Sequence, residues 1–99
     1  MMKEEALIDV LSRFAEDILK YILGDDKIKR EIKISPTTKK IIVYIDVPKE
    51  QRGRIIGKNG MIIDAIKVLA VGIKNTNFSE DKRKVEIEVL EPENFLANK

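Results

Sequence analysis

The spacing of the apolar residues switches between helical and strand-like periods along the chain, and this switching is the strongest constraint on the fold. Residues 6–23 carry apolar side chains three and four positions apart, which predicts an amphipathic helix. Isoleucines at even spacing in residues 28–34, ended by Pro36, predict a half-buried strand. Residues 41–47 alternate more strictly after a short polar turn, so we expect an antiparallel hairpin whose second strand is the more central.

The second half of the chain repeats the change of period. Residues 49–56 are long enough for a short helix, and residues 61–73 carry a helical stripe that is expected to end near Gly72 or Lys74. Residues 85–89 alternate again as a strand. The predicted order is α-β-β-α-α-β, and the crossover through two helices makes the last two strands parallel. The fold class is therefore α+β, with a three-stranded mixed sheet and helices on one face.

Length and composition limit the chain to a single ordinary core. It has 99 residues, of which 43% are hydrophobic and 36% are charged. We expect one domain over residues 1–91 and a loosely attached tail over residues 92–99. The chain has no Cys and no His, which excludes disulfides, zinc sites of the Cys/His type, and imidazole or thiolate catalysis. Its neighbouring acids lie in turns without further converging oxygens, so no metal site is expected.

The N-terminus begins with Met1-Met2-Lys3-Glu4-Glu5, where a signal peptide would carry bases followed by a long apolar run. The longest apolar stretch is also too short to span a membrane. A cytoplasmic protein without a membrane partner is the expectation.

Positive charge is concentrated around a pair of glycines in the middle of the chain. Residues 49–74 hold six bases and two acids, although the net charge of the whole chain is only +2. Gly57 and Gly60 allow a sharp turn and a close ligand approach, and Lys58 and Asn59 between them add a charge and a donor. The turn leads into a helix N-terminus, which favours anions. The pattern indicates a phosphate-contacting loop, with a purely structural turn between two helices as the alternative.

Residues 55–63, which read Ile-Ile-Gly-Lys-Asn-Gly-Met-Ile-Ile, resemble the signature of the KH domain, an RNA-binding module whose GXXG loop clamps about four nucleotides. The element order resembles the type II arrangement of this domain. In size and layout the chain is similar to the small stand-alone bacterial KH proteins of the KhpA type.

The resemblance implies where RNA would contact the chain. The loop would clamp the RNA backbone, and the bases would lie in an apolar groove with the strand at residues 41–47 opposite. The RNA-binding residues expected from this are Gly57, Lys58, Asn59 and Gly60 in the loop, Arg52 and Arg54 before it, Ile56, Ile63 and Ile66 along the groove, and Lys82, Arg83 and Lys84 beside it.

The function expected from these features is non-catalytic binding of short single-stranded RNA, as an RNA chaperone or post-transcriptional regulator. No cofactor, catalytic residue or small-molecule substrate is expected. The resemblance further implies a homodimer, or a heterodimer with a larger KH-containing protein of the Jag/KhpB type. The alternative is a protein-interaction or ribosome-assembly adaptor that uses the same fold for docking. A helix-turn-helix DNA reader is disfavoured, because the helix after the glycines offers Asp64 and mostly aliphatic side chains.

Overall fold

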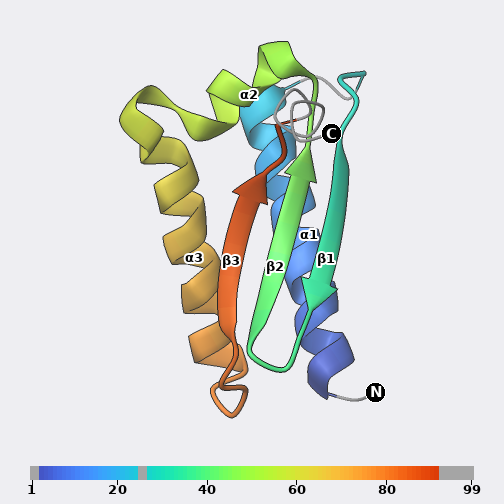
Figure 1. Ribbon diagram of the computed structural model, residues 1–99, viewed down its shortest axis with the longest axis vertical. Coiled ribbons are helices and arrows are strands. Elements are labelled where there is room, and N and C mark those ends of the chain that lie inside the picture. The colour runs from blue at the N-terminus through green and yellow to red at the C-terminus, as the bar shows by residue number, and fades with distance from the viewer. Residues whose placement is uncertain (1–2, 25–26, 92–99) are drawn as a thin grey trace, which may run out of the picture.

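The computed structural model describes residues 3–24 and 27–91, and its elements follow the predicted order (Figure 1). Three α-helices lie on one side of a three-stranded sheet, and a single 3₁₀ turn joins the second helix to the third. The elements are α1 (Lys3–Leu23), β1 (Glu31–Pro36), β2 (Lys40–Asp46), α2 (Lys49–Ile56), the 3₁₀ turn η1 (Lys58–Gly60), α3 (Met61–Asn77) and β3 (Lys84–Val89).

The sheet has the order β1-β2-β3, so β2 is the central strand. β1 runs antiparallel to β2, with Ile32 opposite Ile45, and β3 runs parallel to β2, with Val85 opposite Ile41. The expected mixed sheet and the central position of the second strand are both confirmed. The parallel pair requires the chain to return to the start of the sheet before β3, and α2 and α3 make this return.

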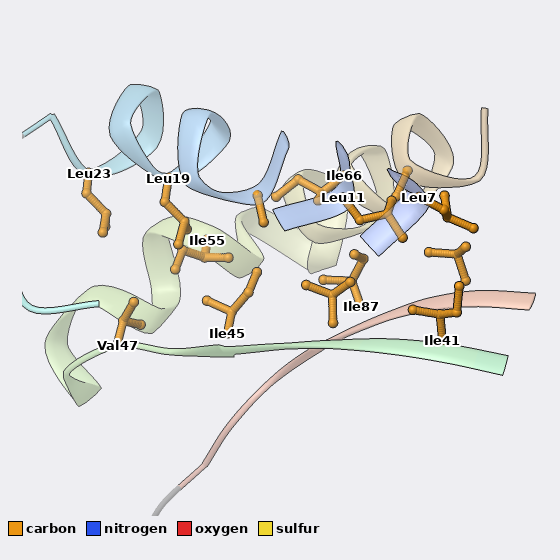
Figure 2. Close-up of a cluster of buried hydrophobic side chains, with 14 residues drawn as sticks. Leu7, Leu11, Leu19, Leu23, Ile41, Ile45, Val47, Ile55, Ile66 and Ile87 are labelled. Carbon is orange, nitrogen blue, oxygen red and sulfur yellow. The ribbon is translucent and has the colours of Figure 1, made fainter. Parts of the chain in front are cut away.

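The core lies between the sheet and the helices (Figure 2). α1 turns one side of its apolar stripe inward, and Leu7, Leu11 and Leu19 are at most 1% exposed. They pack against alternate residues of β2, of which Ile41 and Ile45 are equally buried. The strict alternation in the sequence of β2 therefore arises because every second side chain lies on the inner face of the sheet, directed at the helices.

Three elements have boundaries that differ from the sequence expectation by three residues or more. α1 begins at Lys3 instead of residue 6. β1 begins at Glu31 instead of Ile28 and includes Pro36, which is tolerated because it is the last residue of an edge strand. α3 continues through Gly72 to Asn77, since this glycine lies on an exposed helix surface where nothing requires the chain to turn.

The buried side of α3 also differs from the expected stripe. Ile66 and Ala70 are buried, but Leu69, which also belongs to the apolar stripe of residues 61–73, is 51% exposed. The helix carries apolar residues around most of its circumference, so periodicity did not define which side faces the core. The predicted tail at residues 92–99 lies outside the described residues. Among the described helices, none combines the length and the hydropathy needed to cross a membrane.

Candidate nucleic-acid interface

The segment Gly57 to Gly60 forms a tight turn between α2 and α3, as the sequence predicted. Gly57 has φ 76° and ψ 173°, a conformation that is almost restricted to glycine. Asn59 and Gly60 follow with φ values of 58° and 75°, both in the left-handed region. Asparagine is one of the few other residues that adopt this region readily. The residue types of this turn, which we call the glycine loop, are thus those that its backbone requires.

The glycine loop presents backbone donors at the beginning of α3. Gly60 N–H donates to the Gly57 carbonyl at 3.1 Å, and Met61 N–H donates to the Lys58 carbonyl. Within residues 3–24 and 27–91, the N–H groups of Lys58 and Asn59 have no hydrogen-bond acceptor. Both side chains are exposed. Unpaired N–H groups, the positive end of the α3 dipole and a lysine therefore occur together, and each of these features favours an anion.

The three isoleucines expected to border a groove are not equivalent in the structure. Ile56 and Ile63, one on each side of the glycine loop, are half-buried and expose part of their side chains. Ile66 is only 3% exposed and is one of the labelled core residues in Figure 2. Ile56 and Ile63 are therefore available to a ligand beside the loop, whereas Ile66 holds α3 against the sheet.

The two arginines before the glycine loop also differ. Arg52 is buried on α2, with 8% of its surface exposed, so it is not part of the outer surface around Lys58. Arg54 is exposed, and its Nη1 atom lies 3.1 Å from Gln51 Oε1 and 3.4 Å from the Leu23 carbonyl oxygen. Arg54 thus adds positive charge near the loop while it connects α2 to the end of α1.

The bases at residues 82–84 lie at the opposite end of α3 from the glycine loop (Figure 1). The 17 residues of α3 separate the two places by roughly 25 Å at 1.5 Å per residue. The segment is ordered by Asp81, whose carboxylate accepts hydrogen bonds from the backbone N–H of Arg83 at 3.0 Å and from Nη2 at 2.6 Å. The side-chain hydrogen bonds from Arg83 lower the pKa of Asp81 from 3.8 to about 2.

The strand that lies beside α3 is β3. The sequence analysis instead expected the strand at residues 41–47 to lie opposite the groove. β2 is central and directs its apolar residues into the core, whereas β3 is an edge strand packed against α3. Lys84 N–H and Leu90 N–H donate to carbonyls of residues 39 and 45, so these N–H groups point toward β2. By alternation, the backbone groups of Val85, Ile87 and Val89 point away from β2, toward the open edge.

These edge groups were missed by the sequence analysis. A strand pattern identifies residues 85–89 as a strand, but only the sheet order shows that β3 is at an edge and next to α3. Among the described residues, no group of three or more Asp, Glu, His or Cys side chains is arranged to hold a metal ion.

The combination of an α-β-β-α-α-β order, a mixed three-stranded sheet and a Gly-Lys-Asn-Gly turn between two helices is that of a single KH domain. Comparison with protein-family models gives a match to the KhpA/KhpB KH domain over residues 12–89. The chain therefore belongs to the KhpA/KhpB KH-domain family, and with it to the RNA-binding KH domains. Comparisons with curated proteins and with solved structures gave no match.

Proposed function

We propose that this chain is a non-catalytic, type II KH domain that binds short single-stranded RNA through its glycine loop. The observation that carries the proposal is the pair of unpaired N–H groups at Lys58 and Asn59, which lie at the N-terminus of α3 beside an exposed lysine. These groups supply donors and positive charge for the phosphates of the RNA. These contacts do not distinguish one base from another. The loop therefore positions the RNA backbone, and the neighbouring surface contacts the bases.

Base contacts in this proposal come from aliphatic side chains and the edge of β3. Ile56 and Ile63 offer apolar surface on both sides of the glycine loop. The outward-facing backbone groups of Val85, Ile87 and Val89 offer donors and acceptors to the edges of unstacked bases. The chain contains only five aromatic residues, and none of the groups named here is aromatic, so stacking contributes little. Affinity per domain is therefore modest.

The test is reversal of charge in the glycine loop. The double substitution Lys58→Asp and Asn59→Asp places two negative charges at the α3 N-terminus, and single-stranded RNA affinity should fall by well over tenfold, because about 1.4 kcal/mol is tenfold. Both side chains are exposed, so the free energy of unfolding should change little. Unchanged RNA affinity in a folded double variant would contradict the clamp.

Two further measurements define the binding mode. The logarithm of the affinity should fall with the logarithm of salt concentration at a slope of about −0.7 per phosphate, or roughly −1.5 to −2 for two or three contacts. Duplex RNA should bind more weakly than the same sequence as a single strand, because the bases must be unstacked to reach β3. Equal affinity for both would exclude base contacts at the edge.

Pairing with a second KH protein is supported by a separate surface, which we call the outer stripe of α3. Met61, Val68 and Leu69 are 67%, 71% and 51% exposed. Met61 and Val68 lie on the side of α3 opposite Ile66 and Ala70, and Leu69 lies on the flank between the two sides. This much exposed apolar area on one helix favours a protein contact.

We propose that a second copy, or a larger KH-containing protein of the Jag/KhpB type, covers the outer stripe. Pairing would raise the modest affinity of each domain by linking two RNA sites, which fits a role as an RNA chaperone or post-transcriptional regulator in the cytoplasm. A docking adaptor is the second candidate, and the same stripe favours it. The acidic loop variant separates the two, because an adaptor keeps its partner contact and its cellular role when the glycine loop no longer binds RNA.

A further inference from the structure

β1 forms one edge of the sheet, on the side of β2 away from β3 and the glycine loop (Figure 1). The N–H of Thr37 donates to the Lys40 carbonyl at 2.8 Å, and this bond fixes which residues of β1 pair with β2. By alternation, the backbone groups of Ile32 and Ile34 point away from β2. We call these outward donors and acceptors the β1 edge. They repeat at every second residue, as the groups of any extended chain do, so another strand can pair with them.

Positive charge is denser around the β1 edge than around the glycine loop. Residues 27–40 hold six bases and one acid, whereas residues 49–74 hold six bases and two acids in almost twice the length. Lys29 and Lys33 are both exposed. The acid, Glu31, lies 3.4 Å from Lys33 Nζ in an exposed ion pair, which contributes little to stability, so an incoming carboxylate can replace it. The β1 edge therefore attracts an acidic partner.

A hollow at the beginning of β1 adds to this basic surface. It is lined by residues 27–31 and 46–49, which include four bases and two acids. The first of these two segments leads directly into β1. An extended chain that pairs along β1 therefore reaches the hollow with the residues that lie beyond Glu31. A carboxylate at that end meets more positive than negative charge.

The two faces of β1 define the side chains that a paired strand should carry. Ile32 and Ile34 are half-buried on the inner face, whereas Lys33 lies on the outer face. A paired strand alternates in the same way, so apolar residues fit beside the isoleucines and an acid fits beside Lys33. A second copy of the same edge fits poorly. Antiparallel pairing of two copies about Lys33 would place the two lysines opposite each other, and like charges in this position are unfavourable.

We propose that the β1 edge binds an extended segment of a partner protein in which acidic and apolar side chains alternate, as a fourth strand of the sheet. Main-chain hydrogen bonds to Ile32 and Ile34 supply affinity, and carboxylates beside Lys33 and in the hollow supply specificity. This contact does not require RNA, because the glycine loop and the edge of β3 lie on the other side of β2. Nucleic acid is also attracted to bases, but its backbone lacks the two-residue repeat of donors and acceptors that pairs with a strand.

The first measurement is amide hydrogen exchange with and without a synthetic peptide of about eight residues that alternates Glu and Val. The N–H groups of Ile32 and Ile34 should exchange more slowly when the peptide is bound. Those of Lys33 and Ser35 already pair with β2 and should change much less. No binding at about 1 mM peptide, or binding without slower exchange at Ile32 and Ile34, would overturn the proposal.

The second measurement locates the peptide backbone. One peptide carries N-methyl groups on its Val residues and another on its Glu residues, and only one of these sets of N–H groups can face β1. One peptide should therefore lose about tenfold or more in affinity while the other binds as the unmodified peptide does. Loss with methylated Val indicates an antiparallel strand, and loss with methylated Glu a parallel one. Equal affinities of the two peptides would exclude strand pairing.

The third measurement tests charge. Lys29→Glu together with Lys33→Glu should weaken peptide binding by about tenfold or more. The matched control is Lys20→Glu together with Lys67→Glu, which changes the net charge equally on α1 and α3 and should bind as the wild type does. All four positions are exposed, which keeps the fold. An equal loss in the control would mean that net charge alone attracts the peptide and that the β1 edge is not its site.

Two further results would assign the β1 edge to another occupant. Slower exchange at Ile32 and Ile34 in the free protein as its concentration rises would identify a second copy. Single-stranded RNA that slows exchange at these residues, or displaces the peptide, would identify nucleic acid. The acidic loop variant separates this contact from the proposed function, because it should lose RNA affinity and keep peptide affinity.

Discussion

Ile62 lies directly against Gly57: a Cβ built on Gly57 would stand 2.6 Å from Cγ1 of Ile62 and 2.9 Å from its Cβ. The first residue of the glycine loop is therefore held in contact with the first turn of α3. No side chain fits between them, and the backbone of Gly57 also has a conformation that other residues avoid.

Among alanine substitutions in the glycine loop, Gly57→Ala should reduce the stability of the fold most. It forces both a clash with Ile62 and an unfavourable φ, so we expect the free energy of unfolding to fall by about 2–4 kcal/mol, together with loss of RNA affinity. Chemical denaturation and an RNA titration measure the two effects. A variant as stable as the wild type would show that the turn can adopt another backbone path.

Gly60 and Gly53 provide a comparison within the same basic stretch. Gly60 has φ 75°, and a Cβ at this position would meet its nearest neighbours only at 3.9 Å, so Gly60→Ala should cost about 1 kcal/mol from backbone strain alone. Gly53 lies inside α2 with nothing near a Cβ, and Gly53→Ala should stabilise the protein by several tenths of a kcal/mol, or about 1 at most.

RNA binding should separate the same two variants. Gly60→Ala should weaken binding because its Cβ obstructs the approaching strand, and Gly53→Ala should bind as the wild type does. Gly60→Asn is the control for strain, since asparagine tolerates the left-handed region and should recover stability better than affinity. The opposite ranking of the two alanine variants would place the clamp at a different glycine.

Leu19 and Tyr21 test the core against the surface of α1. Leu19 is fully buried between α1 and the sheet, and Leu19→Ala should reduce the free energy of unfolding by about 2–5 kcal/mol. Tyr21, two residues later, is 86% exposed, and Tyr21→Ala should change it by about 0.5 kcal/mol or less. Thermal or denaturant unfolding measures both. Similar losses in the two variants would contradict the packing of α1.

Asp81 gives the structure an acid-sensitive contact. Its pKa is lowered in the folded state, from 3.8 to about 2, so the pairing with Arg83 stabilises the fold fully above about pH 4 and less as the pH falls toward 2. Asp81→Asn should cost below about 1 kcal/mol at neutral pH, because the pair is partly exposed to solvent. The stabilities of wild type and variant should converge between pH 4 and 2. If the difference in stability between wild type and variant stayed constant across this range, ionisation of Asp81 would not be its cause.

The outer stripe of α3 predicts an association that depends on two side chains. Val68→Lys together with Leu69→Lys should leave the fold intact, since both residues are mostly exposed, and should abolish pairing. Sedimentation of the wild type over a range of concentrations, with and without a KhpB-type partner, supplies the reference. A wild type that stays monomeric with and without the partner would remove the stripe as a pairing surface.

The element order and the sheet were predictable because periodicity records burial. Residues 41–47 alternate and α1 has apolar residues three and four apart because each element buries one side only and exposes more of the other. α3 was harder to interpret, since Leu69 and Ile66 are equally apolar but only the second meets the core.

The glycine loop was predictable for a local reason, whereas the surface around it was not. Gly57 and Gly60 both have positive φ, which glycine adopts most readily, so the residue type itself indicates the turn. The burial of Arg52, the distance of residues 82–84 from the loop and the open edge of β3 depend on how elements far apart in sequence come together. No pattern within a single segment records such an arrangement.

α3 has constraints on nearly its whole circumference, and this should be visible in its tolerance to mutation. Its inner side packs in the core, one flank meets β3, and the outer stripe is apolar and exposed. α1 instead has a solvated side, with exposed Asp9, Arg13, Glu16 and Lys20. In a saturation mutagenesis experiment scored for cellular function, α1 should show tolerated positions with a helical period, whereas α3 should show sensitive positions around every turn. Neutral drift would then alter α1 faster than α3.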